Sequence, residues 1–511
     1  MQVERKSRIV FWYQIYKKVA NVPGYKYVFP ILAILFVVAV IRFPYFSLPL
    51  DRDEGAYAYI GWAWLKGYGI PYLSFFDHKP PLAHLLLGLA TFIKGNDYLS
   101  IRILSFFYIQ IIVLFFYIFV FTLTNRISAI FSTLIFGLYI SSIELEGSYF
   151  NTEIQAILPL LLFVFLMWRM KGLKSPSYLR AIVAGFSGSV SIFFRPVSIY
   201  MVFLVILWYF LVKRNLREVF IIFLGFAIPF LVFILYFGSN NALNDAYTDL
   251  IYYNRRYIQE GFKVGVLSVG GVKGIIRFLG WFTSVPSVLY CFVGVVIFGL
   301  VVSKEAILKI RKPLFFGLLI LLSSWAGVKM GSREFPHYYL SVIPGLCIMF
   351  ALWVKNMINQ KKIGMVVFTA LILVGWLVFR EYRYWISGPL AIQWKQFGSQ
   401  ADWFSDAPKV AKWINQNTKT DDTMWVWANE AEIYFYVGRK NYTKFMNFNG
   451  FWYLPEEEKK WYKEFDQNPP TIIITYINDP PTWIELQKFM DRKPIYEKIT
   501  NIGTYVIFKK R

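Results

Sequence analysis

The sequence predicts a polytopic α-helical membrane protein that ends in a small α/β domain outside the membrane. Three observations support this fold class. Of the 511 residues, 57% are hydrophobic and only 17% are charged, whereas globular proteins contain about 45–50% apolar residues. Many apolar runs approach the ~20 residues that a helix needs to cross a bilayer. After residue 380 the composition changes to that of a water-soluble domain.

The distribution of charge explains the formal net charge of +23. Residues 1–380 contain 36 Lys and Arg against 15 Asp and Glu, whereas residues 381–511 contain 18 against 16. The excess lies in short loops between apolar runs, as the positive-inside rule predicts for cytoplasmic loops. The charge therefore indicates topology and gives no support to a nucleic-acid partner. Cys291 and Cys347 both lie in apolar runs, so the cysteines predict neither disulfides nor a metal site.

If the basic N-terminus is cytoplasmic, the sequence predicts about 11 transmembrane helices. The first apolar run lies deep in the chain and lacks a small-residue cleavage pattern, so we expect an uncleaved anchor. In this threading the even-numbered spans end at Lys or Arg, and 12 of the 15 acidic residues before residue 381 fall in external loops. The expected spans are residues 28–46, 101–123, 127–142, 154–168, 181–194, 197–212, 218–237, 281–302, 314–330, a tenth span that ends before Lys355, and 363–380.

The external segment 47–100 contains two apolar stretches that are short for a span, residues 57–65 and 82–93. We predict that both form juxtamembrane helices that lie against the membrane surface. A full span at 82–93 would invert every later loop and move the basic loops outside, so we reject that alternative.

Residues 381–511 predict a second domain, a small extracytoplasmic α/β domain, after the transmembrane domain of residues 1–380. Residues 406–417, 456–465 and 483–490 have helical patterns. Residues 424–427 and 471–477 are rich in β-forming side chains, and residues 496–499 and 505–508 predict a terminal hairpin.

An acidic cluster at residues 51–55 (Asp-Arg-Asp-Glu-Gly) follows the first span. Ionisable residues beside hydrocarbon are costly, which makes such a cluster a functional hypothesis. Asp53 precedes an aromatic stretch, and its carboxylate could accept a proton from an alcohol if its surroundings raise its pKa. Glu54 is a second catalytic candidate beside it. The structural alternative for Asp53 is a solvated loop or a helix cap.

Residues 77–81 (Asp-His-Lys-Pro-Pro) form a more specific motif in the same external segment. The two prolines fix the backbone and suit the first turn of a helix, so Lys79 is directed rather than free. An ammonium group is a compact charge that suits a phosphate oxygen. Asp77 and His78 join this candidate site. The alternative for Lys79 is contact with lipid headgroups.

Glu153 opens the fourth span from outside, where an acidic residue also suits a helix N-terminus. It is a candidate second catalytic carboxylate that orients the acceptor or holds a cation. Arg195 lies between two apolar spans and should face a polar cavity. We expect Arg195 to contribute positive charge for a phosphate.

Further external cations stand beside aromatic residues: Arg255 and Arg256 among tyrosines, and Arg333 with His337 and Tyr338. They could bind a lipid-borne phosphate, which arginine recognises by bidentate pairing. The alternative is contact with anionic lipid headgroups.

The spacing of the histidines predicts no zinc site, and no Walker or Rossmann glycine loop indicates nucleotide use. We therefore expect the transferred group to arrive on a lipid. No cofactor is required if the cations converge, although Glu153 could help to bind a divalent cation.

With these motifs the chain resembles the GT-C glycosyltransferases. The first span, Asp53-Glu54 in an external loop, the Asp77 to Leu82 element, Glu153 at the fourth span and the C-terminal domain carry the resemblance. Within this group the chain looks most like protein O-mannosyltransferases and lipid A aminoarabinose transferase, of glycosyltransferase family 39 and its relatives.

The resemblance implies transfer of a sugar from a polyprenyl-phosphate donor to a hydroxyl of a lipid, glycan or protein, at the outer face of the cell membrane and usually with inversion. Asp53 matches the family's catalytic aspartate, and Lys79 matches a position near the lipid phosphate. Ala56 stands where the aminoarabinose enzyme has an arginine, and Glu153 stands where the family has Asp. These departures leave the donor sugar and the acceptor open.

Two other functions remain as alternatives. A lipid or polysaccharide transporter of flippase type would carry charged residues in mid-span along a path through the membrane. A non-catalytic scaffold would display the C-terminal domain and would have no cavity that joins residues 47–100 to the later external loops. The charged residues of this sequence cluster at the outer ends of the spans, which favours a site open to one face.

Overall fold

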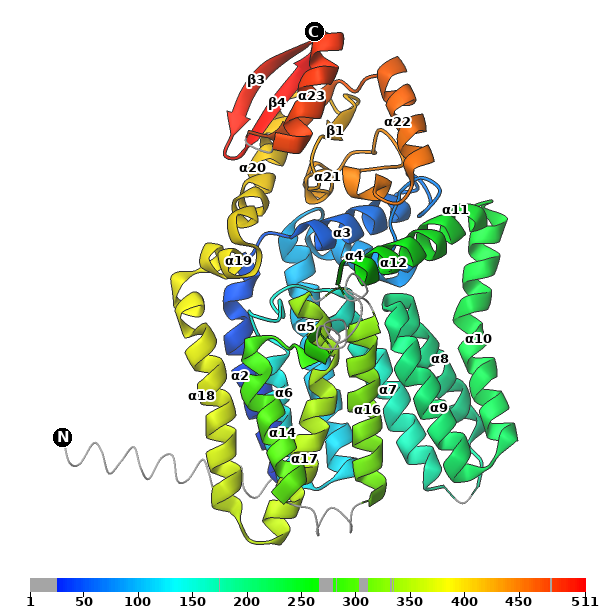
Figure 1. Cartoon of the computed structure of the whole chain (residues 1–511), viewed down its shortest axis with the longest axis vertical. Helices are drawn as coiled ribbons and strands as arrows, with labels where there is room; N and C mark the ends of the chain where they lie inside the picture. The colour runs from blue at the N-terminus through cyan, green and yellow to red at the C-terminus, as the bar shows by residue number, and fades with distance from the viewer. Residues whose placement is uncertain are drawn as a thin grey trace, which may run out of the picture.

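The computed structural model describes residues 25–173, 175–265, 279–281, 283–302, 311–330, 333, 335–477 and 480–511. The predicted basic N-terminus lies outside these residues. In the described part, helices stand side by side in a bundle and the C-terminal domain covers one end of it (Figure 1).

Among the described residues, eight helices are long and apolar enough to cross a membrane, some of them extended by a 3-10 turn. They are α2 (Tyr25–Arg42) with η1 (Phe43–Ser47), α5 (Tyr98–Leu123), α7 (Thr152–Lys171), α9 (Ile199–Lys213) with η2 (Pro196–Ser198), α10 (Leu216–Ser239), α16 (Arg311–Met330), α17 (Ile343–Asn359) with η6 (Pro336–Ser341), and α18 (Ile363–Ser387). Three shorter helices stand at the other expected spans: α6 (Arg126–Tyr139), α8 (Tyr178–Phe194) and α14 (Tyr290–Val302), which follows η4 (Ser287–Leu289).

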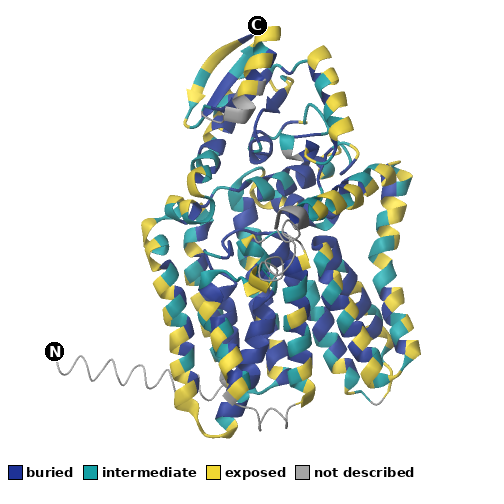
Figure 2. Cartoon of the chain, in the orientation of Figure 1, coloured by how far each residue is buried: buried dark blue, intermediate teal, exposed yellow. Residues whose placement is uncertain are grey.

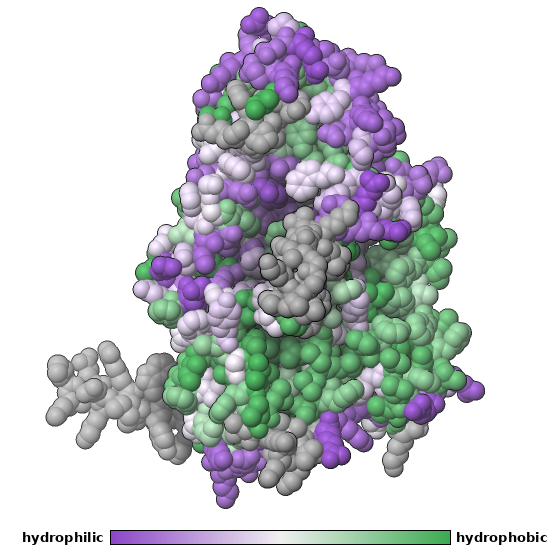
Figure 3. Space-filling model, viewed as in Figure 1, coloured by the Kyte–Doolittle hydropathy of each residue, from purple (hydrophilic) through white to green (hydrophobic). Residues whose placement is uncertain are grey.

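The prediction of a polytopic helical membrane protein is thus confirmed, while the number of 11 spans stays a prediction. Figure 3 shows that apolar surface covers the bundle on the face in view, in a band below the polar C-terminal domain. Within α10 only 11% of the apolar window is buried inside the protein. This helix therefore packs on α8 along one narrow face, at Ile222 and Gly225, and exposes much of its remaining apolar surface to lipid.

Two juxtamembrane helices, α3 (Arg52–Leu65) and α4 (Pro81–Lys94), take the place of the two short stretches in the external segment. Figure 1 shows α3 lying across the end of the bundle, beneath the C-terminal domain. α3 and α4 approach closely at Gly61, where an added Cβ would overlap the carbonyl oxygen of His84 and lie 2.7 Å from the backbone nitrogen of Gly88. Only glycine allows this separation of the two backbones.

Gly61→Ala is expected to destabilise the protein by about 1–3 kcal/mol or more, because the methyl group meets backbone atoms that cannot move aside. Thermal unfolding of the purified protein in detergent measures the effect. The matched control is Gly375→Ala on α18, where an added Cβ meets nothing within 4 Å. That substitution should be neutral or slightly stabilising, since alanine favours a helix by about 1 kcal/mol over glycine. Equal stability of both variants would contradict the close packing of α3 on α4.

After α10 the chain continues, at the end of the bundle that faces the C-terminal domain, through three short helices, α11 (Leu243–Tyr247), the π-helical turn η3 (Thr248–Tyr253) and α12 (Asn254–Gly265). Lys444 of the C-terminal domain pairs with Asp245 at 3.0 Å and with Asp249 at 3.3 Å. These ion pairs hold the segment against the C-terminal domain.

The C-terminal domain contains a four-stranded sheet of order β1-β2-β4-β3. β1 (Met424–Val426) runs parallel to β2 (Ile472–Tyr476), and β4 (Tyr505–Lys510) pairs antiparallel with β2 and with β3 (Tyr496–Ile502). The helical elements are α19 (Pro389–Phe397), η7 (Gly398–Gln400), α20 (Ala401–Asn417), α21 (Glu432–Val437), η8 (Phe448–Phe451), α22 (Pro455–Gln467) and α23 (Pro480–Arg492). Each helix and strand predicted after residue 400 is present, with ends that differ by a few residues.

Aromatic side chains fill the interior of this domain. Trp425 of β1 and Trp427, directly after this strand, are fully buried and contact Trp461 and Phe465 of α22, with ring centroids 4.7–6.2 Å apart. Figure 2 shows the buried residues continuing from this domain through α3 into the bundle. The two parts of the chain therefore share one packed junction.

That junction is centred on the first turns of α3. Arg52 pairs with Glu430 at 2.8 Å, and the hydroxyl of Tyr59 donates to the carbonyl of Arg439 at 3.0 Å. An added Cβ on Gly55 would overlap the backbone of Glu432, so α21 rests directly on α3. The C-terminal domain thus fixes one face of the helix that carries the acidic cluster.

Candidate functional site

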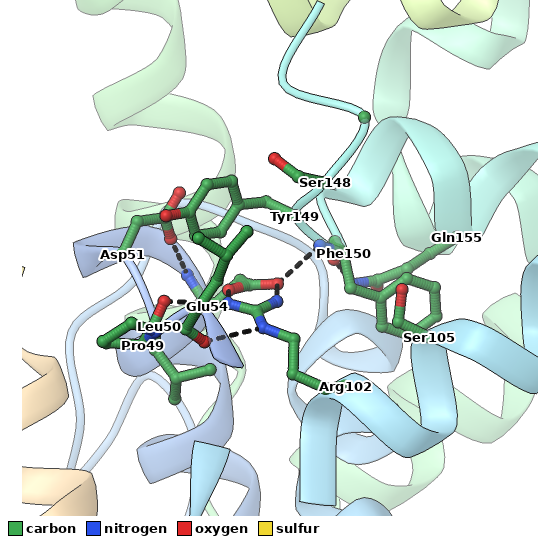
Figure 4. Close-up of polar contacts among 12 residues, drawn as sticks. Pro49, Leu50, Asp51, Glu54, Arg102, Ser105, Ser148, Tyr149, Phe150 and Gln155 are labelled. Carbon is green, nitrogen blue, oxygen red and sulfur yellow. Dashed lines mark hydrogen bonds and ion pairs between the residues drawn. The ribbon is translucent and has the colours of Figure 1, made fainter. Parts of the chain in front are cut away.

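A buried ion pair anchors the start of α3 on the bundle (Figure 4). Glu54 pairs with Arg102 of α5 through both carboxylate oxygens, at 2.7 and 2.8 Å, and also accepts from the N–H of Phe150. Arg102 donates further to the carbonyls of Leu48 and Pro49. All hydrogen-bonding capacity of the Glu54 carboxylate is directed to protein groups. We therefore interpret Glu54 as a residue that positions α3, although the sequence placed it among the catalytic candidates.

The cap of α3 is Asp51, whose Oδ1 accepts the N–H of Glu54 at 2.8 Å. Burial, followed by the charges of Glu54 and Asp53, raises the pKa of Asp51 well above its ordinary value. The capping role that was the alternative for Asp53 thus belongs to Asp51. Asp53 is left free of that structural task.

Asp53 lies in the first turn of α3 and is partly exposed. The hydroxyl of Tyr57, one turn later, donates to Asp53 Oδ2 at 3.3 Å. Burial, with a further contribution from the charge of Asp53, raises the pKa of Tyr57, so this phenol stays protonated as a donor. The charge of Asp53 also acts on His78, in the loop before α4, and on His337 and Tyr338 of η6.

Glu153 and Arg195 bring two spans to the same place. Glu153, at the start of α7, pairs with Arg195 Nε at 3.2 Å. The Arg195 guanidinium lies 5.0 Å above the Tyr338 ring and donates to the Tyr338 carbonyl at 3.4 Å. Since Lys79 and His337 also act electrostatically on Glu153, the start of α7, the end of α8, η6 and the loop before α4 converge here.

The backbone of Lys79 is held from both sides, as the prolines predicted. Its N–H donates to Asp77 Oδ1 at 2.9 Å, and its carbonyl accepts from the hydroxyl of Tyr72 at 2.8 Å. Tyr72 itself adopts a φ of 71°, a conformation that costs a non-glycine residue about 1–3 kcal/mol. Within the described residues no carboxylate lies within ion-pair distance of the Lys79 ammonium. The group is therefore directed at the site and still available to a ligand.

A hydrogen bond between Asp77 and His84 fixes the carboxylate that binds the backbone of Lys79. Asp77 Oδ2 accepts from His84 Nε2 at 3.0 Å, with the His84 side chain fully buried. Burial alone would raise the pKa of Asp77, but the hydrogen bond and charge of His84 outweigh it and hold the pKa below its usual value. Asp77 thus stays a carboxylate and orients the backbone of Lys79.

The ring of His78 belongs to an aromatic stack beside the site. It lies against Tyr253 and Tyr257, with centroids at 5.3 and 5.8 Å. Burial, followed by the charge of Lys79, lowers the pKa of His78 to about 4, so the ring is neutral at physiological pH. Arg333 covers Tyr257 at 4.7 Å and donates to the hydroxyl of Tyr453 at 3.2 Å. Arg333 therefore closes the stack toward the C-terminal domain.

The structure separates the last two predicted cations from this cluster. Arg255 and Arg256 are exposed on α12, and the Arg256 guanidinium lies 4.7 Å above the Tyr252 ring. Among the described contacts none joins either arginine to Asp53, Lys79 or Arg195. Their position on an exposed helix fits the alternative of contact with lipid headgroups.

One acidic residue beside the clustered side chains was not predicted from the sequence. Glu146, in the loop between α6 and α7, is buried and its Oε2 lies 2.6 Å from Nδ1 of His337. Glu146 has a φ of 55°, which costs about 1–3 kcal/mol and is typical of functional sites. The acidic residues of its loop were visible in the sequence, but only folding brings residues 146 and 337 together.

The described residues contain no group of three or more His, Cys, Asp and Glu side chains that could hold a metal ion. Glu153, the residue for which a cation was considered, already pairs with Arg195. Figure 3 shows that hydrophilic surface gathers in a hollow between the C-terminal domain and the apolar band.

Comparison with known proteins identifies the fold. No family model matches the sequence, and no curated protein matches it. Among solved structures, the chain is similar to GT-C fold glycosyltransferases, as the sequence resemblance predicted. The polytopic GT-C fold with a small C-terminal sheet is therefore confirmed.

Two of these similar structures are of ArnT, the lipid A aminoarabinose transferase, from Cupriavidus metallidurans. The one bound to undecaprenyl phosphate has a TM-score of 0.57 and 14% identity, over 94% of this chain and 97% of that chain. The apo form has a TM-score of 0.52 and 13% identity, over 93% and 97%. An oligosaccharyltransferase from Archaeoglobus fulgidus, in complex with Zn and sulfate, has a TM-score of 0.49 and 15% identity, over 87% and 68%. At these identities the likeness concerns the fold.

Proposed function

We propose that this protein is a glycosyltransferase that moves a sugar from a polyprenyl-phosphate donor to a hydroxyl acceptor, which is a lipid, a glycan or a protein. The observation that carries the proposal is the convergence of Asp53 with Lys79, Glu153 and Arg195 at one end of an apolar bundle. The similar fold of ArnT bound to undecaprenyl phosphate supports a lipid-borne phosphate as ligand.

The proposed reaction gives separate roles to the negative charge of Asp53 and to the positive charge of Lys79. Displacement at an anomeric carbon needs a base that takes the proton of the incoming hydroxyl, and Asp53 is the partly exposed carboxylate with that freedom. The departing phosphate needs positive charge, and such electrostatic stabilisation is often the largest catalytic contribution. Lys79 supplies a cation that has no carboxylate partner among the described residues, and Arg195 and His337 add donors beside it. A single displacement by the acceptor inverts the anomeric centre.

The proposal includes the topology. With a cytoplasmic N-terminus, α3, the site and the C-terminal domain lie on the extracytoplasmic side of the plasma membrane. A polyprenyl tail would then remain in the outer leaflet while its phosphate meets Lys79. The apolar band below the hydrophilic hollow supports this arrangement (Figure 3).

The placement of buried charge favours a transferase over a transporter. Within the described part of the long spans, buried charged side chains lie within the first or last two turns of their helices, at Arg42, Arg102, Glu153, Glu218, Lys329 and Glu381. A transport path would require such residues near the middle of the bilayer. The proposed site is instead open to one face.

A direct test of the function is a transfer assay with radiolabelled sugars carried on undecaprenyl phosphate. Purified protein in lipid vesicles should release free undecaprenyl phosphate and pass the label to a hydroxyl acceptor from an envelope extract. A parallel assay in which the sugar is carried on the neutral alcohol undecaprenol, and not on undecaprenyl phosphate, gives the background. Movement of intact labelled lipid across the vesicle membrane without transfer would favour the transporter.

Lys79→Ala is expected to weaken the binding of undecaprenyl phosphate about 10–100-fold, because a hydrogen bond to a charged group contributes about 1.5–3 kcal/mol. Stabilisation of the protein against thermal unfolding by the lipid, titrated in detergent, measures this affinity. Lys66→Ala is the matched control, since Lys66 is an exposed lysine one residue beyond α3. Unchanged affinity in Lys79→Ala would remove Lys79 from the phosphate site.

A further inference from the structure

The backbone of the loop between α6 and α7 is held in place around Glu146. Neighbours fix the loop on both sides of this residue: Arg42 donates to the Gly147 carbonyl at 2.7 Å, and Glu381 accepts the N–H groups of Ile143 and Glu144 at 3.0 Å. With its backbone so constrained, Glu146 keeps its left-handed conformation and its carboxylate is directed at His337.

His337 is bound through one of its two nitrogens. Nδ1 faces Glu146 at 2.6 Å, which leaves Nε2 on the opposite edge of the ring. The described hydrogen bonds give Nε2 no partner within the protein. The ring is stacked on Phe335 and packed against Tyr338, so its plane is fixed.

We propose that Glu146 is a positioning residue that keeps His337 in the doubly protonated form, so that Nε2–H donates a hydrogen bond to the phosphate of the donor lipid. The inference rests on the proposed function, because it assigns the phosphate of that donor to Nε2. It adds to that function a carboxylate whose role is to set the charge of a neighbouring group.

The charged groups around His337 determine the expected pH dependence. Three carboxylates act on its ring: Glu146 from the loop, Glu153 from α7 and Asp53 from α3. Glu153 is already paired with Arg195, so Glu146 is the carboxylate in direct contact. A nearby negative charge favours the protonated imidazole. Loss of the Glu146 charge should therefore let His337 lose its proton at a lower pH.

The experiment measures the affinity of undecaprenyl phosphate from pH 5.5 to 8.5 for the full-length protein and for Glu146→Gln. The lipid phosphate titrates in this range itself, near pH 6, but equally for every variant, so the ratio of the two dissociation constants is the informative quantity. We expect a ratio near 1 at the acidic end, where His337 is protonated in both proteins. We expect the ratio to rise to about tenfold at the alkaline end.

Two further variants separate positioning from mere folding. In a His337→Gln background, Glu146→Gln should cause no additional change in affinity at any pH, since the two residues act through one contact. Glu144→Gln is the matched control: Glu144 belongs to the same loop, but its carboxylate contacts Arg380 and Ser287. Its ratio to the unchanged protein should not depend on pH.

The outcomes distinguish the inference from the function on which it rests. If the unchanged protein binds undecaprenyl phosphate no better than undecaprenol, the proposed function fails. If it binds the phosphate but the ratio for Glu146→Gln is constant across the pH range, or the effects add in the double variant, the role of Glu146 is overturned.

Discussion

Asp53→Asn is expected to lower kcat for sugar transfer about 10²–10⁴-fold, the usual contribution of a general base. Asparagine has nearly the same shape, but its amide cannot accept the proton of the acceptor hydroxyl. The Tyr57 hydroxyl can still donate to the amide oxygen, so thermal unfolding and the binding of undecaprenyl phosphate should change little. The transfer assay and a thermal unfolding curve on the same preparation measure both quantities.

Asp51→Asn provides the control for this prediction, two residues earlier in the same turn. Asparagine caps a helix as well as aspartate does, and the raised pKa of Asp51 means that burial disfavours a charge at this position. Because the cap is kept, this variant should fold and keep its activity. If Asp53→Asn retained full transfer, or if both variants lost it equally, the base would have to be sought elsewhere.

The second large effect concerns stability. Arg102→Met should destabilise the protein by about 3–5 kcal/mol, because it leaves the Glu54 carboxylate buried without its partner. We expect a low yield of folded protein and a lowered Tm in detergent. The loss should extend to activity, since Glu54 and Arg102 fix the helix that carries Asp53 (Figure 4).

The double variant Glu54→Leu with Arg102→Met tests the cause. Buried ion pairs can be replaced by apolar pairs of similar volume at little cost, so the double variant should be more stable than Arg102→Met alone. If the double variant were the less stable of the two, the harm would come from lost packing around α5 and not from an unpaired charge.

The sequence was sufficient for the elements that depend on local pattern. The apolar runs and the charge of their flanking loops predicted the helices, and the two prolines after Lys79 predicted the start of α4. The strands of the C-terminal domain were visible because their β-branched and aromatic residues are grouped. Each of these signals lies within a few neighbouring residues.

The division of roles among the acidic residues could not be predicted in this way. Asp51, Asp53 and Glu54 are almost adjacent, yet one caps α3, one faces the site and one pairs with Arg102, 48 positions away. Their separation depends on the ~100° turn between successive helix residues and on what each side chain meets. The pairing of Glu146 with His337 spans 191 positions and has no local signal.

The direct contact of α21 with α3 at Gly55 has a consequence for how the chain can vary. A domain that rests on the backbone of the helix carrying the proposed base cannot be exchanged or removed as an independent module. Sequence change at its inner surface would tilt that helix and shift a carboxylate that must meet its substrate within a fraction of an ångström. The C-terminal domain would in this way form one side of the proposed site.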